Sequence, residues 1–197
     1  MYIPRYLETS DGETVEISNN EYGYWIDEEG EFAQLVADLE GGIPVTREPV
    51  YSHAGIGRNG EDDLMGSYVE ISLSKQHLWF YKDGELLTET DVVTGQPVGI
   101  NKKTGEKEDW STYKGAYPLA YKESNAILSS DIYGYETPVD YWMPFVYGQG
   151  LHDAGWQTSF GGDRYLTNGS HGCVNLPPSQ AALIFENIET GYPILIY

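Results

Sequence analysis

Residues 151–176 read LHDAGWQTSFGGDRYLTNGSHGCVNL, and this stretch gathers reactive side chains between glycines. It contains Cys173, the single cysteine of the chain, together with His152, Ser170 and His171. A thiol is mostly protonated near neutral pH, so a nucleophilic cysteine needs a base or a cation within hydrogen-bond distance. His152 and His171 are the nearby candidates. We therefore expect a Cys–His pair in which an imidazolium contact lowers the pKa of the thiol.

Two glycines, Gly169 and Gly172, lie close to the cysteine and accept backbone torsions that other residues resist. This freedom lets backbone amides point at an oxyanion that develops during attack on a carbonyl. The N–H groups of Gly172 and Cys173 are the candidate donors. We expect a hairpin to return the chain from His152 to Cys173, because such partners are neighbours in space rather than in sequence.

An inert buried cysteine is the common alternative for a lone thiol. The Ser-His-Gly-Cys sequence is poor core material, however, because two polar side chains would need buried partners. A zinc site made of His152, His171 and Cys173 is disfavoured, since no further cysteine or closely spaced histidine completes a tetrahedron. We expect no metal and no cofactor.

The chain before this stretch alternates between apolar and polar residues from Tyr68 onward, which indicates a half-buried sheet. The expected strands cover residues 68–73, 78–81, 86–94, 116–121 and 139–146, and the charged residues 101–110 are loop-like. Near the end, Pro177 and Pro178 suit a helix entry, and Gly191 ends that helix before a last strand at 193–197. The pattern predicts a mainly β domain with a short C-terminal helix.

The first residues form a different pattern. Residues 6–17 resemble a hairpin around Asp11-Gly12, and apolar residues at helical spacing follow between Asp27 and Gly42. These apolar residues are Phe32, Leu35, Val36 and Leu39. We expect three parts: a partial α+β module, a linker and the β domain. Their bounds are 1–50, 51–66 and 67–197.

Charge limits the class of partner. The chain has 31 acidic and 11 basic residues, for a net charge of −20. Such a chain repels a polyphosphate backbone, so nucleic acid is excluded as a partner. No apolar run approaches the ~20 residues that span a bilayer, and the N-terminus lacks the regions of a signal peptide. A piece of a longer, exported protein would show the same pattern, and the incomplete first module favours that interpretation.

The run Ser170-His171-Gly172-Cys173-Val174-Asn175, with 17 residues between His152 and Ser170, resembles the signature of the L,D-transpeptidase (YkuD-type) catalytic domain. The resemblance covers about residues 67–197, from a first hairpin at 68–81 to the final helix and strand. Residues 1–50 resemble the tail of a peptidoglycan-binding-like module. The resemblance implies a β-sandwich or meander-type fold and a cell-wall or cell-surface location. It also implies a monomer whose partners are peptidoglycan stem peptides and β-lactam (carbapenem) inhibitors.

The resemblance also implies roles for individual residues. Cys173 would attack the diamino-acid carbonyl of a tetrapeptide stem, release D-alanine and hold the stem as a thioester. An amine of a second stem would then form a 3→3 cross-link. His152 would take the thiol proton, with the carbonyl of Asp153 or Ser170 orienting its ring. The remaining residues expected in the oxyanion and substrate sites are Ser170, His171, Gly172, Tyr135, Trp156, Asp153 and Asn175, the last replacing an arginine of many relatives.

One position departs from the family pattern. Where relatives have Ser/Thr-Pro-x-Gly, residues 111–115 read STYKG, which relaxes the turn and affects loop geometry and acceptor preference. Two other functions remain open: another cell-wall thiol enzyme, such as an L,D-carboxypeptidase or a sortase-like transferase, and a non-catalytic wall-binding module. Residue order argues against papain-like peptidases and sortases, because His152 precedes Cys173 and no arginine follows close behind it.

Overall fold

The computed structural model describes residues 4–53 and 63–197, and strands dominate it. The larger sheet has five strands in the order β10-β15-β5-β6-β7, and a second sheet has four in the order β11-β12-β13-β14. The strands of the first sheet are β5 Tyr68–Ser72, β6 His77–Lys82, β7 Glu85–Asp91, β10 Gly115–Pro118 and β15 Pro193–Ile196. Those of the second are β11 Glu123–Ser130, β12 Tyr135–Val146, β13 Gln149–Asp153 and β14 Val174–Leu176. The expectation of a mainly β fold is confirmed.

The strands of the first sheet follow from the alternation of residues that point to its two faces. Val69 and Ile71 of β5 lie opposite Phe80 and Leu78 of β6 in antiparallel register, and all four side chains are fully buried. Their neighbours along each strand point to the other face, as the two-residue period of a strand requires. The C-terminal strand β15 pairs in parallel with β5 and antiparallel with β10. The C-terminal strand therefore lies inside this sheet, between β10 and β5.

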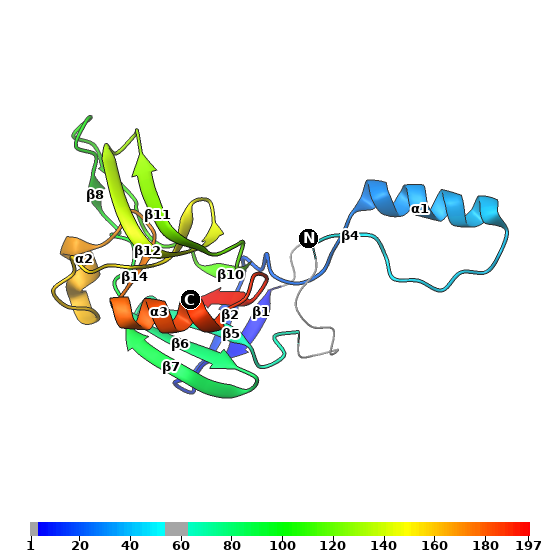
Figure 1. Ribbon diagram of the computed structural model, residues 1–197, viewed down its shortest axis with the longest axis horizontal. Coiled ribbons are helices and arrows are strands. Elements are labelled where there is room, and N and C mark those ends of the chain that lie inside the picture. The colour runs from blue at the N-terminus through cyan, green and yellow to red at the C-terminus, as the bar shows by residue number, and fades with distance from the viewer. Residues whose placement is uncertain (1–3, 54–62) are drawn as a thin grey trace.

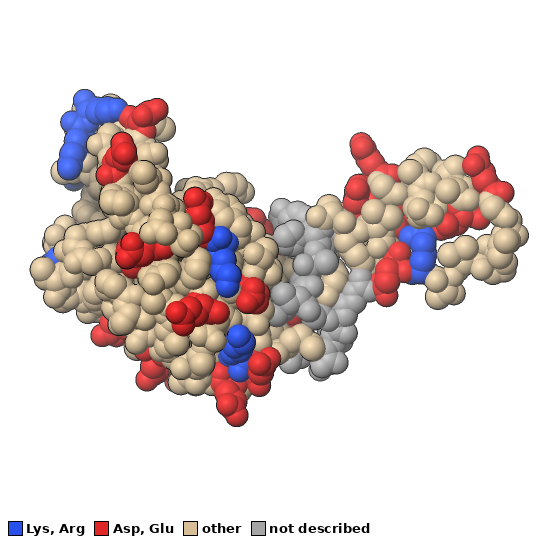
Figure 2. Space-filling view, in the orientation of Figure 1, with Lys and Arg blue, Asp and Glu red and all other residues tan. Residues whose placement is uncertain are grey.

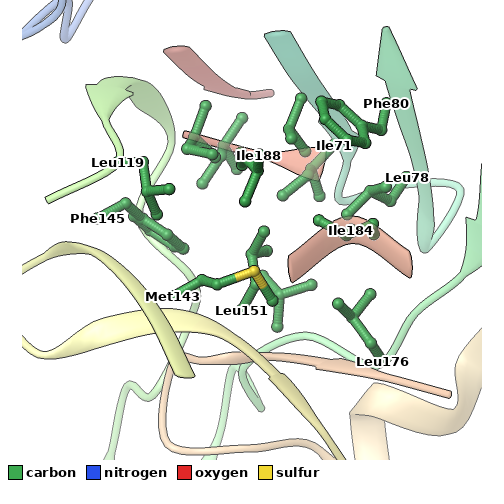
Figure 3. Close-up of a cluster of buried hydrophobic side chains, with 14 of the residues drawn as sticks. Ile71, Leu78, Phe80, Leu119, Met143, Phe145, Leu151, Leu176, Ile184 and Ile188 are labelled. Atoms are coloured by element: carbon green, nitrogen blue, oxygen red, sulfur yellow. The ribbon is translucent and has the colours of Figure 1, made fainter. Parts of the chain in front are cut away.

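The helix α3, Pro178–Asn187, fills the space between the two sheets. Figure 3 shows Ile184 of this helix between Leu78 of the first sheet and Leu176 of the second. The helix contacts β12 and β13 on one side and β7 on the other. The predicted C-terminal helix is confirmed, with Pro178 in its first turn. By packing against both, the helix joins the second sheet, which carries the reactive stretch, to the first.

The second sheet differs from the expectation at one point. Strands β13 and β14 pair in parallel, with His152 opposite Asn175 and Leu151 opposite Val174. The expected hairpin from His152 to Cys173 is therefore wrong. A parallel pair needs a crossover of a dozen or more residues. Residues 154–173 supply it, and they include a 3₁₀ turn, η1 Gly162–Arg164, and a short helix, α2 Tyr165–Asn168.

Other elements depart from the sequence-based bounds. Strand β11 was not expected, β12 begins at Tyr135 rather than at residue 139, and the loop-like region 101–110 contains one strand of a small hairpin. This hairpin consists of β8 Gly99–Ile100 and β9 Lys107–Glu108. It projects beside the tip of β11 and β12 (Figure 1), and basic side chains gather on it (Figure 2).

The N-terminal hairpin, β1 Arg5–Glu8 and β2 Thr14–Ile17, packs on the first sheet. Leu7 and Ile17 share an apolar cluster with Leu195 of β15. The fully buried Glu70 joins the same parts, since it accepts hydrogen bonds from the Ser10 amide and hydroxyl at 2.9 and 2.6 Å and from the Tyr197 hydroxyl at 2.5 Å. A carboxylate with three donors is compatible with burial. The expected hairpin is confirmed.

The expected helix forms as α1, Glu28–Gly41, with Asp27 capping its start and Gly42 in the left-handed conformation at its end. Strands β3 Trp25–Ile26 and β4 Tyr51–His53 lead to and from it. Figure 1 shows α1 extending away from the sheets. None of its residues is buried, and its apolar residues Phe32, Leu35, Val36 and Leu39 are exposed.

Most of the predicted linker, residues 54–62, lies outside the described residues, and the division into three parts stays a prediction. Within 4–53 and 63–197, every helix is too short or too polar to cross a bilayer.

Candidate active site

The parallel pairing of β13 and β14 brings the reactive side chains to one cavity. His152 lies on β13, and Cys173 immediately precedes β14. The cavity has a volume of about 400 Å³ and is partly open. Seven of the expected site residues line it: Tyr135, His152, Trp156, Ser170, His171, Cys173 and Asn175. The other two, Asp153 and Gly172, do not line this cavity, but each forms a hydrogen bond with a residue that does.

His152 is buried, and its ring orientation is fixed. Its Nδ1 lies 2.8 Å from the carbonyl oxygen of Asp153. A carbonyl can only accept, so Nδ1 carries the proton and Nε2 is left as a base. Burial lowers the pKa of His152, opposed by that hydrogen bond and the nearby Asp153 carboxylate. The imidazole is therefore neutral at pH 7, which a general base requires.

The Asp153 side chain supports this arrangement from the next residue of the same strand, β13. Its carboxylate accepts hydrogen bonds from the backbone N–H groups of Asp140 and Tyr141, both at 2.9 Å. These bonds join β12 to the end of β13 next to His152. The expectation that Asp153 contacts substrate finds no support in its position, because its side chain is committed to the sheet.

The state of the thiol contradicts the sequence-based expectation. Cys173 is partly exposed, and its sulfur lies 3.8 Å from the Gly148 carbonyl oxygen. Burial raises the pKa of the Cys173 thiol to about 11, and a backbone hydrogen bond with Gly150 opposes this effect only in part. A raised pKa keeps the sulfur protonated at neutral pH. The resting site thus contains a neutral thiol and a neutral imidazole.

Ser170 holds the turn that presents the thiol. Its hydroxyl donates to the Cys173 carbonyl oxygen at 2.5 Å and accepts from the Gly172 N–H at 3.0 Å. One of the two expected oxyanion donors, the Gly172 N–H, is therefore already engaged. The Cys173 N–H has no hydrogen-bond partner among the residues that the structure describes. It remains the candidate oxyanion donor.

Gly172 must be a glycine for two reasons. Its φ is +119°, which side chains rarely adopt, and a Cβ there would lie 2.2 Å from Nε2 of Gln149. Gln149 cannot move freely, because its amide accepts from the Tyr113 N–H at 2.9 Å and donates to the Ser111 carbonyl at 3.1 Å. The tight packing fixes the peptide that precedes the nucleophile.

Thr112 fixes the same peptide from the other side, and sequence reasoning missed it. Its buried hydroxyl accepts from the Gly95 N–H at 2.9 Å and donates to the Gly172 carbonyl at 2.8 Å. The carbonyl and N–H of a trans peptide point in opposite directions. Holding the Gly172 carbonyl therefore aims the Cys173 N–H toward the other side. Thr112 lies in the turn that departs from the family pattern, and hydrogen bonds there replace the restraint of a proline.

His171 lies among three aromatic rings. The ring centroids of Trp110, Tyr133 and Tyr135 are 4.0, 4.7 and 5.2 Å from its own. Burial and the Lys102 charge lower the pKa of His171, so it is neutral at pH 7. The rings also line an adjoining cavity of about 220 Å³. Trp110 follows β9 and Tyr133 lies in the turn between β11 and β12, and no sequence period would have identified them.

Asn175 contains a buried atom without a partner. Its backbone pairs with Val93 in both directions, at 2.9 and 3.1 Å, while its Oδ1 is buried and makes no hydrogen bond with the described residues. Such an atom costs free energy unless a ligand or water satisfies it. Among residues 4–53 and 63–197, no group of three or more His, Cys, Asp or Glu side chains is arranged to hold a metal ion.

Comparisons with known proteins agree with this geometry. Residues 66–196 match the family model described as YkuD, the L,D-transpeptidase catalytic domain. The chain is similar to L,D-transpeptidase 2 of Mycobacterium tuberculosis (strain CDC 1551 / Oshkosh), with 30% identity over 108 residues. That match covers 50% of this chain and 26% of the relative, so it spans about a quarter of the relative's length.

Solved structures show the same likeness. A crystal structure of a Cys-to-Ser mutant of the Enterococcus faecium L,D-transpeptidase is 32% identical, with a TM-score of 0.77 over 99% of this chain and 74% of that one. The NMR structure of the catalytic domain from E. faecium L,D-transpeptidase acylated by ertapenem is 41% identical. It has a TM-score of 0.56 and covers 67% of this chain and 97% of that one.

Proposed function

This chain belongs to the L,D-transpeptidase catalytic domain family, and we propose that it forms 3→3 cross-links in peptidoglycan through a thioester on Cys173. The donor is a tetrapeptide stem, and D-alanine is released. The observation that carries the proposal is the shared cavity of His152 and Cys173, in which a fixed imidazole tautomer leaves one nitrogen free for the thiol proton.

The first half-reaction acylates the enzyme. As the sulfur of Cys173 attacks the carbonyl carbon of the third residue, its proton passes to Nε2 of His152. Proton transfer accompanies attack, because burial raises the pKa of the thiol and lowers that of the imidazole. The Cys173 N–H stabilises the oxyanion. The carbon–nitrogen bond then breaks, and the D-alanine amine leaves with the proton from His152.

The second half-reaction transfers the stem. The side-chain amine of a second stem attacks the thioester carbonyl, and Nε2 of His152 takes a proton from that amine. The carbon–sulfur bond breaks, and the sulfur of Cys173 recovers the proton. The product is a new amide between two stems. The unpartnered Oδ1 of Asn175 accepts a substrate N–H, and the exposed Trp156 ring provides an apolar wall.

We also propose that carbapenems acylate Cys173 and that the chain acts outside the cytoplasmic membrane. Support for the first comes from the E. faecium catalytic domain, whose structure is that of the enzyme acylated by ertapenem. Support for the second is the substrate, since stem peptides are cross-linked in the wall. Action as a monomer stays a prediction.

Mass spectrometry with a defined tetrapeptide tests the proposal. Wild type should yield an acyl-enzyme, free D-alanine and a cross-linked dimer, whereas Cys173→Ala should yield none of these. A bare tripeptide as sole product would instead establish an L,D-carboxypeptidase. Turnover by Cys173→Ala would overturn the assignment of the nucleophile. A wild-type chain that forms no adduct with peptide or carbapenem would favour a non-catalytic wall-binding module.

A further inference from the structure

The cavity contains one permanently charged side chain, that of Arg164. The chain has almost three acidic residues for each basic one, yet no Asp or Glu of the described residues lines this cavity. Its other ionisable groups are the thiol, Tyr135 and two histidines that are neutral at pH 7. Placing Arg164 there gives the cavity a positive charge on a protein whose surface is mainly negative (Figure 2).

The guanidinium of Arg164 is held in place and has donors to spare. Its Nε donates to Oε1 of Gln157 at 3.1 Å, and Nε2 of Gln157 donates to the Asn168 carbonyl at 2.9 Å. These bonds use one edge of the group. Arg164 forms no ion pair with a described carboxylate, and its two terminal nitrogens donate to no described residue. A guanidinium with both terminal nitrogens available is suited to bind a carboxylate through two parallel hydrogen bonds.

We propose that Arg164 binds the free C-terminal carboxylate of the donor stem and selects donors that end one residue after the scissile bond. This inference rests on the proposed function. In a tetrapeptide donor, three bonds separate the carbonyl carbon that Cys173 attacks from the terminal carboxylate carbon, so the two are only ~3–4 Å apart. The carboxylate therefore enters the same cavity as the sulfur. A pentapeptide places its carboxylate one residue, ~3.5 Å, farther along.

Lys102 is the competing cation. It lines the adjoining cavity with Tyr135 and His171 rather than the cavity of the thiol. It is an ammonium on a flexible stem in a projecting hairpin, which gives charge without the planar geometry of a guanidinium. Arg164 instead lies in the crossover between β13 and β14, whose two ends hold the base and the nucleophile.

The test compares two donors that differ only at the terminus, a tetrapeptide with a free carboxylate and the same peptide with a carboxamide. For each, kcat/KM of acylation is measured from release of the fourth residue. Wild type should prefer the carboxylate by about 10- to 100-fold, the range for a hydrogen-bonded charge. In Arg164→Gln the ratio should fall to about 1, mainly through KM. Arg164→Lys, which retains charge but not the fork, should give an intermediate ratio.

The controls separate the possible failures. Lys103→Gln removes the same charge from a residue outside both cavities and should retain the wild-type ratio. A wild-type ratio of 1, a full ratio in Arg164→Gln, or loss of the ratio in Lys102→Gln instead would overturn the inference while acylation itself persists. The inference would also be overturned if Arg164→Gln instead lost a preference for donors with a free carboxylate on the second residue of the stem, because Arg164 would then bind that carboxylate. If wild type is acylated by neither donor, the proposed function fails and this inference with it. If Arg164→Gln does not fold, Arg164→Lys supplies the comparison.

Discussion

Replacement of Thr112 by valine tests how the nucleophile is held. Valine has nearly the same shape as threonine, so Thr112→Val removes the hydroxyl without opening a cavity. The Gly95 N–H and the Gly172 carbonyl then lose their partner. An unpaired buried polar group costs ~1–3 kcal/mol. We expect the free energy of unfolding to fall by about 3 kcal/mol in total, which lowers the thermal midpoint by ~6–12 °C for a chain of this size.

Function should suffer more than stability. The Gly172 carbonyl and the Cys173 N–H belong to one peptide plane, so a freed carbonyl lets the candidate oxyanion donor turn away. Loss of one such donor slows acyl transfer by ~100- to 1000-fold, and a misaligned donor should reduce acylation by at least ~10-fold. Calorimetry measures the first effect, and stopped-flow acylation by a carbapenem measures the second.

The matched control is Thr112→Ser, which keeps the hydroxyl and both hydrogen bonds. It should lose about 1 kcal/mol through the missing methyl group and retain most of the acylation rate. A Thr112→Val variant with the thermal midpoint and acylation rate of wild type would refute this account of the loop. So would equal losses in the serine and valine variants.

Three further perturbations address other parts of the molecule. Because burial raises the pKa of the Cys173 thiol to about 11, alkylation by iodoacetamide should stay slow to about pH 9 and then rise; an inflection below pH 8 would show a stabilised thiolate. Because the pKa of His152 lies below its ordinary value of 6.5, acylation should rise with pH as the imidazole loses its proton, with a midpoint below pH 6.5; a midpoint above pH 7 would contradict a buried neutral base. Glu70→Gln puts an amide among the Ser10 and Tyr197 donors and should cost ~1–3 kcal/mol in urea unfolding, whereas an unchanged midpoint would mean that Glu70 does not fasten the N-terminal hairpin.

Local sequence patterns predicted the elements whose formation is decided by residues close together in the sequence. The alternation of Val69 and Ile71 identified β5, because one face of that strand is apolar and belongs to the core, although the polar face that carries Glu70 is buried as well. Asp27 and Gly42 marked the ends of α1, since capping is decided within a few residues. Strand β11 escaped notice because Ala126 is its only buried residue, which leaves no alternation to detect.

The direction of pairing and the state of the site depend on residues far apart in the sequence. Periodicity gives a strand's face but not its orientation, so the parallel β13–β14 pair was mistaken for a hairpin. The pKa of Cys173 follows from the density of atoms around the sulfur, which no motif records. Arg164 lay within the stretch quoted at the outset, but only the cavity lining revealed that no Asp or Glu of the described residues lines the cavity with it.

The crossover from β13 to β14 separates the residues that react from the residues that select the donor. His152 lies in β13 and Cys173 directly precedes β14, whereas Trp156, Gln157, Arg164 and Asn168 line the cavity from the middle of the crossover. Residues 155–169 can therefore be replaced as one segment. Such a replacement would change which donors are selected and would leave His152 and Cys173 unchanged. Substitutions within this segment would change which donors the enzyme accepts without changing the residues that react.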